Sequence, residues 1–127
     1  MFTVTSNTDR NRLYITLAGH MEGPERQEAL RAILAAAAGL APGFGVVSDI
    51  ASLHPSNEEG FRDLLRVKAA LKLKGAGPIV RVVKIALSRI QIERISEASG
   101  YHAEHVGSLE EADQYLDAMQ GTVQVES

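Results

Sequence analysis

The stretch "FGVVSDIASLHPSNEEGF", residues 44–61, contains the transition that decides the fold. An apolar, β-branched run ends at Asp49, a loop with a proline follows, and Ser56 precedes a segment of helical periodicity. Beyond that segment, "IVRVVKIA" at 79–86 is nearly continuous in β-branched residues, which is typical of a buried parallel strand. A strand, a helix and a second strand in this order predict a right-handed parallel crossover.

On the N-terminal side, "FTVTS" (2–6) and "LYITLAG" (13–19) alternate in hydrophobicity around a polar turn, which predicts a β-hairpin. A helix is predicted over 23–40, because Pro24 suits a first turn and Gly39 suits a left-handed terminator. Four of its residues have the i, i+3, i+4, i+7 spacing of a buried stripe: Leu30, Ile33, Leu34 and Ala37.

On the C-terminal side, the pattern predicts further elements in the same alternation. The inner face of the last helix is predicted to hold Leu109, Ala112, Leu116 and Met119. The prediction is an α/β domain with a five-stranded, mostly parallel sheet, an N-terminal antiparallel hairpin strand and four helices. It covers residues 1–119 as one domain and leaves 120–127 as a tail. The C-terminal elements are helices over 56–74, 88–100 and 108–119 and a strand over 101–106.

The composition is that of an ordinary globular chain. It has 127 residues, a formal net charge of −3 and no cysteine, so disulfides and thiolate metal sites are excluded. No apolar run approaches the ~20 residues of a membrane span, and the N-terminus has no secretory leader pattern. We therefore expect a cytoplasmic protein with no membrane span and no nucleic-acid partner.

Charge is unevenly distributed along the chain. Residues 60–94 hold nine basic and two acidic residues, a balance of +7, whereas residues 95–127 hold seven acidic and no basic residues, a balance of −7. One interpretation is a solvated helix face beside a solvated acidic end. The other is charge complementarity, either within the fold or between subunits. Complementarity between subunits predicts self-association as a symmetric homodimer.

Three serines occupy helix starts in the same pattern. Ser56, Ser88 and Ser108 are each followed three residues later by Glu or Gln, which is the spacing of a capping box. A hydroxyl in this position accepts a hydrogen bond from an exposed backbone N–H of the first turn. The repetition predicts that capping is the main role of Ser56.

A functional interpretation exists beside the structural one. Helix N-termini and strand ends of a parallel sheet share one edge, where ligands bind in open α/β sheets. His20, Asp49 and His54 offer the residue types of an enzyme, but no motif defines their geometry. His102 and His105 point to opposite faces of a strand, so no metal site and no cofactor are predicted. The candidate ligand or partner rim is His20, Asp49, His54, Ser56, Ser88, Arg89 and Ser108.

The arrangement resembles the SpoIIAA-like group of the STAS superfamily. The resemblance spans residues 2–119 and rests on the hairpin with "NRLYITLAG", the stretch "PGFGVVSDI", the "VVKIA" strand and "ISEASGYHAEHVGSLEEADQYL". It implies a non-enzymatic domain that binds partner proteins, as in anti-sigma-factor antagonists. It also implies that Asp49 matches the aspartate after the third strand and that Ser56 lies near the position of a phosphorylated serine. The group is related in fold to the CRAL-TRIO lipid carriers.

Three functions remain open at this point. The first is a non-catalytic regulatory module that binds a protein partner. The second is a carrier of a small anion or apolar molecule at the strand-end rim. The third is a hydrolase-type enzyme that uses His20, Asp49 and His54.

Overall fold

The computed structural model describes residues 1–54, 58–83 and 104–126. The helix predicted over 88–100 lies outside these residues. The described elements are β1 (Phe2–Asn7), β2 (Arg12–Gly19), α1 (Gly23–Ala37), β3 (Gly45–Leu53), α2 (Glu58–Leu73), β4 (Ile79–Val82), β5 (Glu104–Val106) and α4 (Leu109–Glu126).

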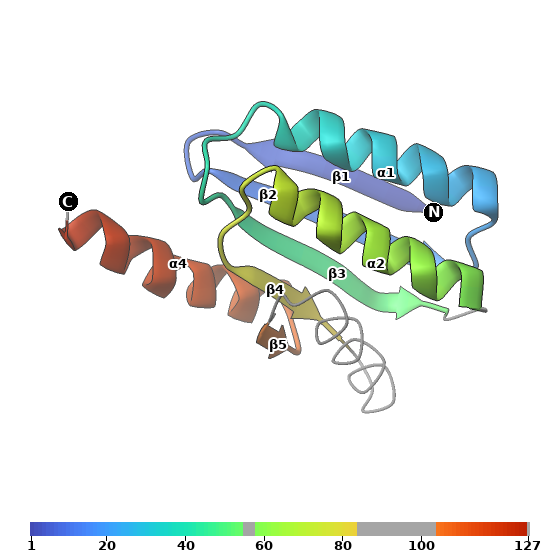
Figure 1. Cartoon of the computed structure of the whole chain (residues 1–127). Coiled ribbons are helices and arrows are strands. Elements are labelled where there is room, and N and C mark those ends of the chain that lie inside the picture. The colour runs from blue at the N-terminus through green and yellow to red at the C-terminus, as the bar shows by residue number, and fades with distance from the viewer. Residues whose placement is uncertain (55–57, 84–103, 127) are drawn as a thin grey trace.

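The strands form one mixed sheet in the order β1-β2-β3-β4-β5 (Figure 1). The β1–β2 hairpin is antiparallel, with Phe2 opposite Leu17 and Asn7 opposite Arg12. Each following neighbour pairs in parallel, so strands β2 to β5 end at the same edge of the sheet. The predicted α/β class and the antiparallel pair at the N-terminal edge are confirmed.

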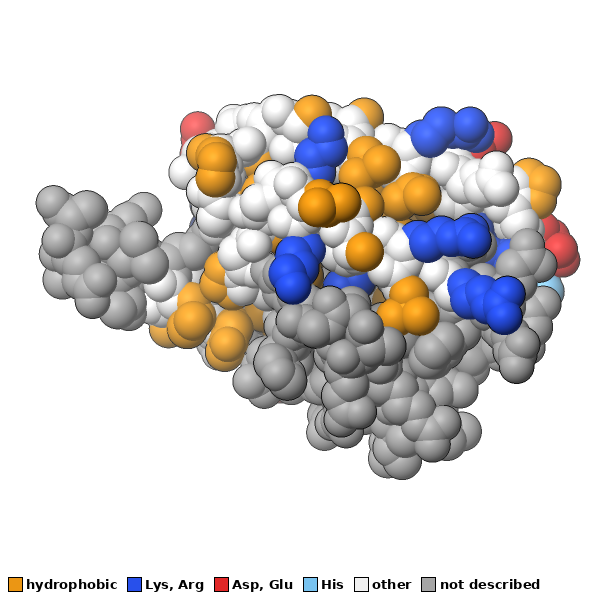
Figure 2. Space-filling model, in the orientation of Figure 1, with side chains coloured by type: hydrophobic (Ala, Val, Ile, Leu, Met, Phe, Trp, Pro, Cys, Tyr) orange, Lys and Arg blue, Asp and Glu red, His pale blue; other side chains and the backbone are white. Residues whose placement is uncertain are grey.

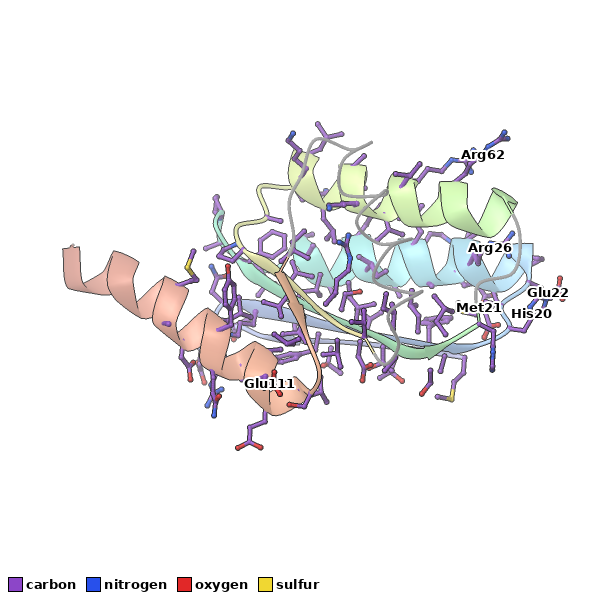
Figure 3. The ribbon with its side chains drawn as sticks, turned by 90° about the horizontal axis from the view of Figure 1, so that it is seen from below. His20, Met21, Glu22, Arg26, Arg62 and Glu111 are labelled. Atoms are coloured by element: carbon purple, nitrogen blue, oxygen red, sulfur yellow. The ribbon has the colours of Figure 1, made fainter. Side chains whose placement is uncertain are left out.

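Helices cover both faces of the sheet. Helices α1 and α2 lie on one face and α4 lies on the other (Figures 1 and 3). The alternation of side chains along a strand builds a separate core on each face. On β3, Val46 belongs to the core beneath α1 and α2, and the next residue, Val47, belongs to the core beneath α4 with Ala112 and Leu116.

Helix α1 starts as predicted but ends differently. Pro24 lies in its first turn, and the helix finishes at Ala37 with Ala38 as a right-handed cap. The prediction that Gly39 is a left-handed terminator is wrong, because the last turn tightens instead, with the Leu40 N–H donating to the Ala37 carbonyl at 3.1 Å. The buried stripe is also rotated. Its fully buried members are Ala29, Ile33 and Ala37, whereas the predicted Leu30 and Leu34 are half-buried.

Helix α4 is longer than predicted and overhangs the sheet. Ala112 and Leu116 are fully buried, as the predicted inner face requires. The same prediction is wrong for Leu109 and Met119, which are 49% and 45% exposed. The helix continues through the predicted tail to Glu126, and its C-terminal part projects beyond the sheet (Figure 1).

A buried arginine attaches α4 to the sheet. Arg12 on β2 is 3% exposed, and its guanidinium contacts Asp113 at 3.0 Å and Asp117 at 2.6 Å. The Tyr14 hydroxyl donates to the same Asp113 oxygen at 2.8 Å. Burial alone would lower the pKa of Arg12, but its bonds to Asp117 and Tyr14 outweigh burial and raise it. The network joins residues 101 and 105 positions apart in the chain.

Two loops contact each other at the edge of the sheet opposite the one where β2 to β5 end. The Gly43 N–H donates to the Gly75 carbonyl at 2.7 Å, and the Gly77 N–H donates to the Phe44 carbonyl at 2.8 Å. A Cβ on Gly77 would meet the Gly43 carbonyl oxygen at 2.5 Å, which is closer than atoms can approach without displacement of the backbone. The contact therefore requires glycine at position 77.

Among the described helices, none combines the length and the apolar character that a membrane crossing demands.

Replacement of Gly77 tests this close approach. Gly77→Ala should lower the free energy of unfolding by roughly 1–3 kcal/mol, because the backbone of one loop must shift. Gly39→Ala is the matched control, since its Cβ would meet only the Ala36 carbonyl oxygen at 3.8 Å. It should be neutral or slightly stabilising by its effect on the unfolded chain. Urea denaturation of both variants decides, and equal losses would contradict the structure.

Removal of Asp113 tests the attachment of α4. Asp113→Ala leaves the buried Arg12 with one carboxylate and removes the acceptor of the Tyr14 hydroxyl, which should destabilise the fold by on the order of 3 kcal/mol. Glu110→Ala, an exposed acid on the same helix, should change stability by less than about 0.5 kcal/mol. Chemical denaturation at neutral pH measures both. If the two variants lose stability equally, the network does not anchor the helix.

Candidate functional site

The ends of β2 and β3 place two histidines next to each other. Gly19 pairs with Leu53 at the last step of the parallel ladder, and the His54 N–H donates to the Gly19 carbonyl at 3.0 Å. His20 and His54 therefore follow neighbouring strand ends, and both are exposed. The structure places these two residues of the predicted rim at the same edge of the sheet, and their role as a binding rim stays a prediction.

The loop after β2 is held by its buried residue and by an arginine of α1. Met21 is 4% exposed and belongs to the core, and Arg26 donates from Nη1 to the Met21 carbonyl at 2.6 Å. With Met21 turned inward, His20 and Glu22 point outward, and His20 Nε2 lies 3.4 Å from Glu22 Oε1. Figure 3 shows these four residues at one end of the molecule.

Arg62 of α2 lies at the same end as this loop (Figure 3). The surface at this end is called the strand-end tip below, and it is defined by the exposed residues His20, Glu22, His54 and Arg62 and the half-buried Arg26. It combines two imidazoles, two guanidinium groups and one carboxylate, so its guanidinium cations outnumber its carboxylate. The sequence-based reasoning missed Glu22, Arg26 and Arg62, although all three lie within the first two turns of a predicted helix or directly before one.

Asp49 does not lie at the tip. Strand β3 was predicted to end with this residue but continues to Leu53, and Asp49 pairs with Thr16 and Val82 inside the sheet. The register shifts just beyond it, and its Oδ1 accepts a hydrogen bond from the Ala51 N–H at 3.1 Å. This bond pairs the Ala51 N–H, a backbone donor that the irregular strand pairing leaves without a ladder partner.

The interpretation of His20, Asp49 and His54 as a catalytic group requires contact between them. His54 is five strand residues beyond Asp49, a separation of roughly 15 Å along an extended chain. A general base must lie within about 3 Å of its partner. The described geometry therefore does not bring the three residues together.

Ser108 caps α4, as its sequence pattern predicted. Its hydroxyl accepts a hydrogen bond from the Glu111 N–H at 3.2 Å, and the Glu111 carboxylate reaches back to the Gly107 N–H at 3.5 Å. Figure 3 places Glu111 well away from His20. Ser108 is thus remote from the strand-end tip, and its hydroxyl has a structural role.

The other three predicted rim residues, Ser56, Ser88 and Arg89, lie outside the described residues. Within the described residues, no group of three His, Asp or Glu side chains is arranged to hold a metal ion.

Two buried cations face each other between α2 and β4. Lys68 is 2% exposed and Arg81 is 7% exposed. Val80 and Val82 belong to the core beneath α4, so the alternation along β4 turns Arg81 toward α2. Burial, together with the charge of Arg81, lowers the pKa of Lys68 to about 7. Burial likewise lowers the pKa of Arg81 to about 10.

The comparison with known proteins supports the fold alone. No family model matches the sequence, and no curated protein matches it. Among solved structures, the chain is similar to an anti-sigma factor antagonist from Mycobacterium paratuberculosis, with a TM-score of 0.57 and 12% sequence identity. The match covers 91% of this chain and 94% of that chain. The chain therefore has the fold of the SpoIIAA-like STAS domains, and the resemblance predicted from the sequence is confirmed at the level of the fold.

The lowered pKa of Lys68 predicts a pH-dependent stability. The pKa of Lys68 is about 7 in the folded chain and takes its ordinary value of 10.5 in the unfolded chain. Between these two pH values the unfolded chain therefore holds one more proton than the folded chain. The free energy of unfolding should therefore rise with pH in this window, by up to about 1.4 kcal/mol per unit. Below pH 7 the lysine is protonated in both states and its contribution stops changing.

Lys68→Met removes this titration and should flatten the rise between pH 7 and 9. Lys74→Met is the control, because Lys74 is exposed and its loss should leave the slope unchanged. Urea unfolding at several pH values measures the slope for each variant. Identical slopes for wild type and Lys68→Met would show that Lys68 is not the responsible group.

Proposed function

We propose that this chain is a non-catalytic regulatory module that binds a protein partner in the cytoplasm. The observation that carries the proposal is the fold, which it shares over nearly its whole length with an anti-sigma factor antagonist. By its name, that protein acts on an anti-sigma factor, and we propose the same class of partner for this chain. The small-ligand alternative has no support from the comparisons.

The strand-end tip is the proposed contact surface. It gathers exposed polar groups from two strand ends and two helix starts, while the loop beneath it is held by Met21 and Arg26. A pre-organised surface with exposed arginine and histidine side chains suits a partner with acidic groups at its centre. Ser56, Ser88 and Arg89 stay in the proposal as predicted rim residues, with Ser56 as the cap of α2. The described arrangement offers no contact between His20, Asp49 and His54, which supports a binding role over catalysis.

The direct test is binding of anti-sigma factors from the source organism to the purified chain. Isothermal titration calorimetry should find at least one that binds. Arg62→Glu should weaken that binding at least tenfold, about 1.4 kcal/mol, because it reverses a charge at the tip. Arg31→Glu makes the same change at an exposed site of α1 away from the helix start and should have little effect. The proposal fails if no anti-sigma factor binds, and the tip is the wrong surface if both variants weaken binding equally.

A further inference from the structure

The C-terminal end of α4 begins with Asp117, which binds Arg12 of β2 at 2.6 Å. Among the side chains of α4 that the structure describes, Leu116 is the last fully buried one, and the next three residues, 117–119, are all exposed. The helix nevertheless continues to Glu126, which adds ten residues or about 15 Å at 1.5 Å per residue. Most helical stability in proteins comes from the packing of a buried face, and the described side chains 117–119 at the start of this segment gain none from full burial. The segment 117–126 is called the overhang below.

The same end of the molecule carries the most exposed large apolar side chain among the described residues. Leu73, the last residue of α2, is 89% exposed. It lies between the exposed lysines Lys72 and Lys74. Figure 2 shows Lys and Arg side chains interleaved with apolar ones over the face that α1 and α2 cover, with acidic groups only at its margins.

The overhang and the end of α2 are complementary in chemistry. The overhang presents Met119, which is 45% exposed, beside Asp117, whose side chain is 64% exposed. The sequence holds no Lys or Arg after residue 94, so α4 has no basic residue. The C-terminal end of α2 combines an apolar side chain with basic neighbours, and the overhang combines an apolar side chain with an acidic neighbour.

The two surfaces face different sides of one molecule. Helix α2 lies on one face of the sheet and α4 on the other, although both C-terminal ends lie toward the same end of the sheet (Figures 1 and 3). One chain therefore does not bring them together. Consider a two-fold axis that passes the same end of the sheet, lies in the plane of the sheet and runs perpendicular to the strands. Rotation about this axis exchanges the two faces of the sheet, so α2 of the second copy lies on the same side as α4 of the first copy. That operation forms both contacts at once, as an isologous dimer requires.

We propose that the chain forms a symmetric dimer in which the overhang of each α4 packs against the C-terminal end of α2 in the other copy. Leu73 of one copy meets Met119 of its partner, and Lys72 and Lys74 lie near the partner copy's Asp117. The dimer uses the end of the molecule opposite the strand-end tip. Both tips therefore stay available, and the dimer is independent of the proposed function.

The absence of cysteine allows a direct test of this contact. Two single variants, Leu73→Cys and Met119→Cys, are purified separately, mixed and oxidised. The mixture should form a disulfide-linked dimer that neither variant forms alone, because each cysteine needs the other one across the interface. A mixture of Leu73→Cys with Leu109→Cys is the control and should not cross-link, since Leu109 is at the start of α4.

Sedimentation velocity supplies the second measurement, at concentrations in the tens of micromolar. Wild type should sediment as a dimer that weakens as salt rises. Leu73→Glu should be monomeric but still folded by circular dichroism, because the side chain is exposed in the monomer and the new carboxylate faces an acidic helix. Leu109→Glu should remain dimeric. A monomeric wild type, a dimer that survives Leu73→Glu, growth beyond two copies or cross-linking through Leu109→Cys would each overturn the proposal.

Discussion

The three-layer arrangement depends on one buried charge, the guanidinium of Arg12. The apolar contact between α4 and this face of the sheet joins Ala112 and Leu116 to three buried valines, with Tyr14, Ala51, Val106 and Tyr115 packed around them. Apolar contact is non-directional, so a directional bond is needed to fix the course of the helix. Arg12 selects it by binding two carboxylates one helical turn apart on α4. The free-energy cost of burying the Arg12 guanidinium is offset by its bonds to these two carboxylates. Removal of either carboxylate would leave an uncompensated charge in the interior. The direction of the overhang follows from the same contact.

The mostly parallel sheet divides the molecule into two ends with different chemistry. At one end, strands β2 and β3 finish and helices α1 and α2 begin, which concentrates histidine and arginine side chains at the strand-end tip. At the other end, loops close through backbone contacts between Gly43, Phe44, Gly75 and Gly77, and the helices finish. Partner binding at the tip and self-association at the helix ends are therefore compatible, because the length of the sheet separates them.

Lys68 is the clearest departure from a simple apolar pattern. It occupies the i+4 position of the stripe formed with Leu64, Val67 and Leu71, so the helical spacing already marks it as inward-facing. The sequence-based interpretation counted it with the solvated basic residues of this segment, because lysine is rarely buried. The structure places it beside Arg81 with a pKa near neutrality. The local excess of positive charge is thus partly an internal feature and partly a surface one.

The sequence by itself determined the α/β class, the hairpin, the order of the described strands and helices and the cap at Ser108. These features follow from periodicity and local hydrogen bonding, which act over a few residues. Only the tertiary structure decided that Asp49 lies within a strand, because the extent of β3 depends on pairing with β2 and not on its own residues. It also decided that Leu109 and Met119 are exposed, since burial depends on the surface that the rest of the fold places beneath each helical position. Contacts such as Arg12 with Asp113, between residues 101 positions apart, leave no local pattern, and they exist only once the chain has folded.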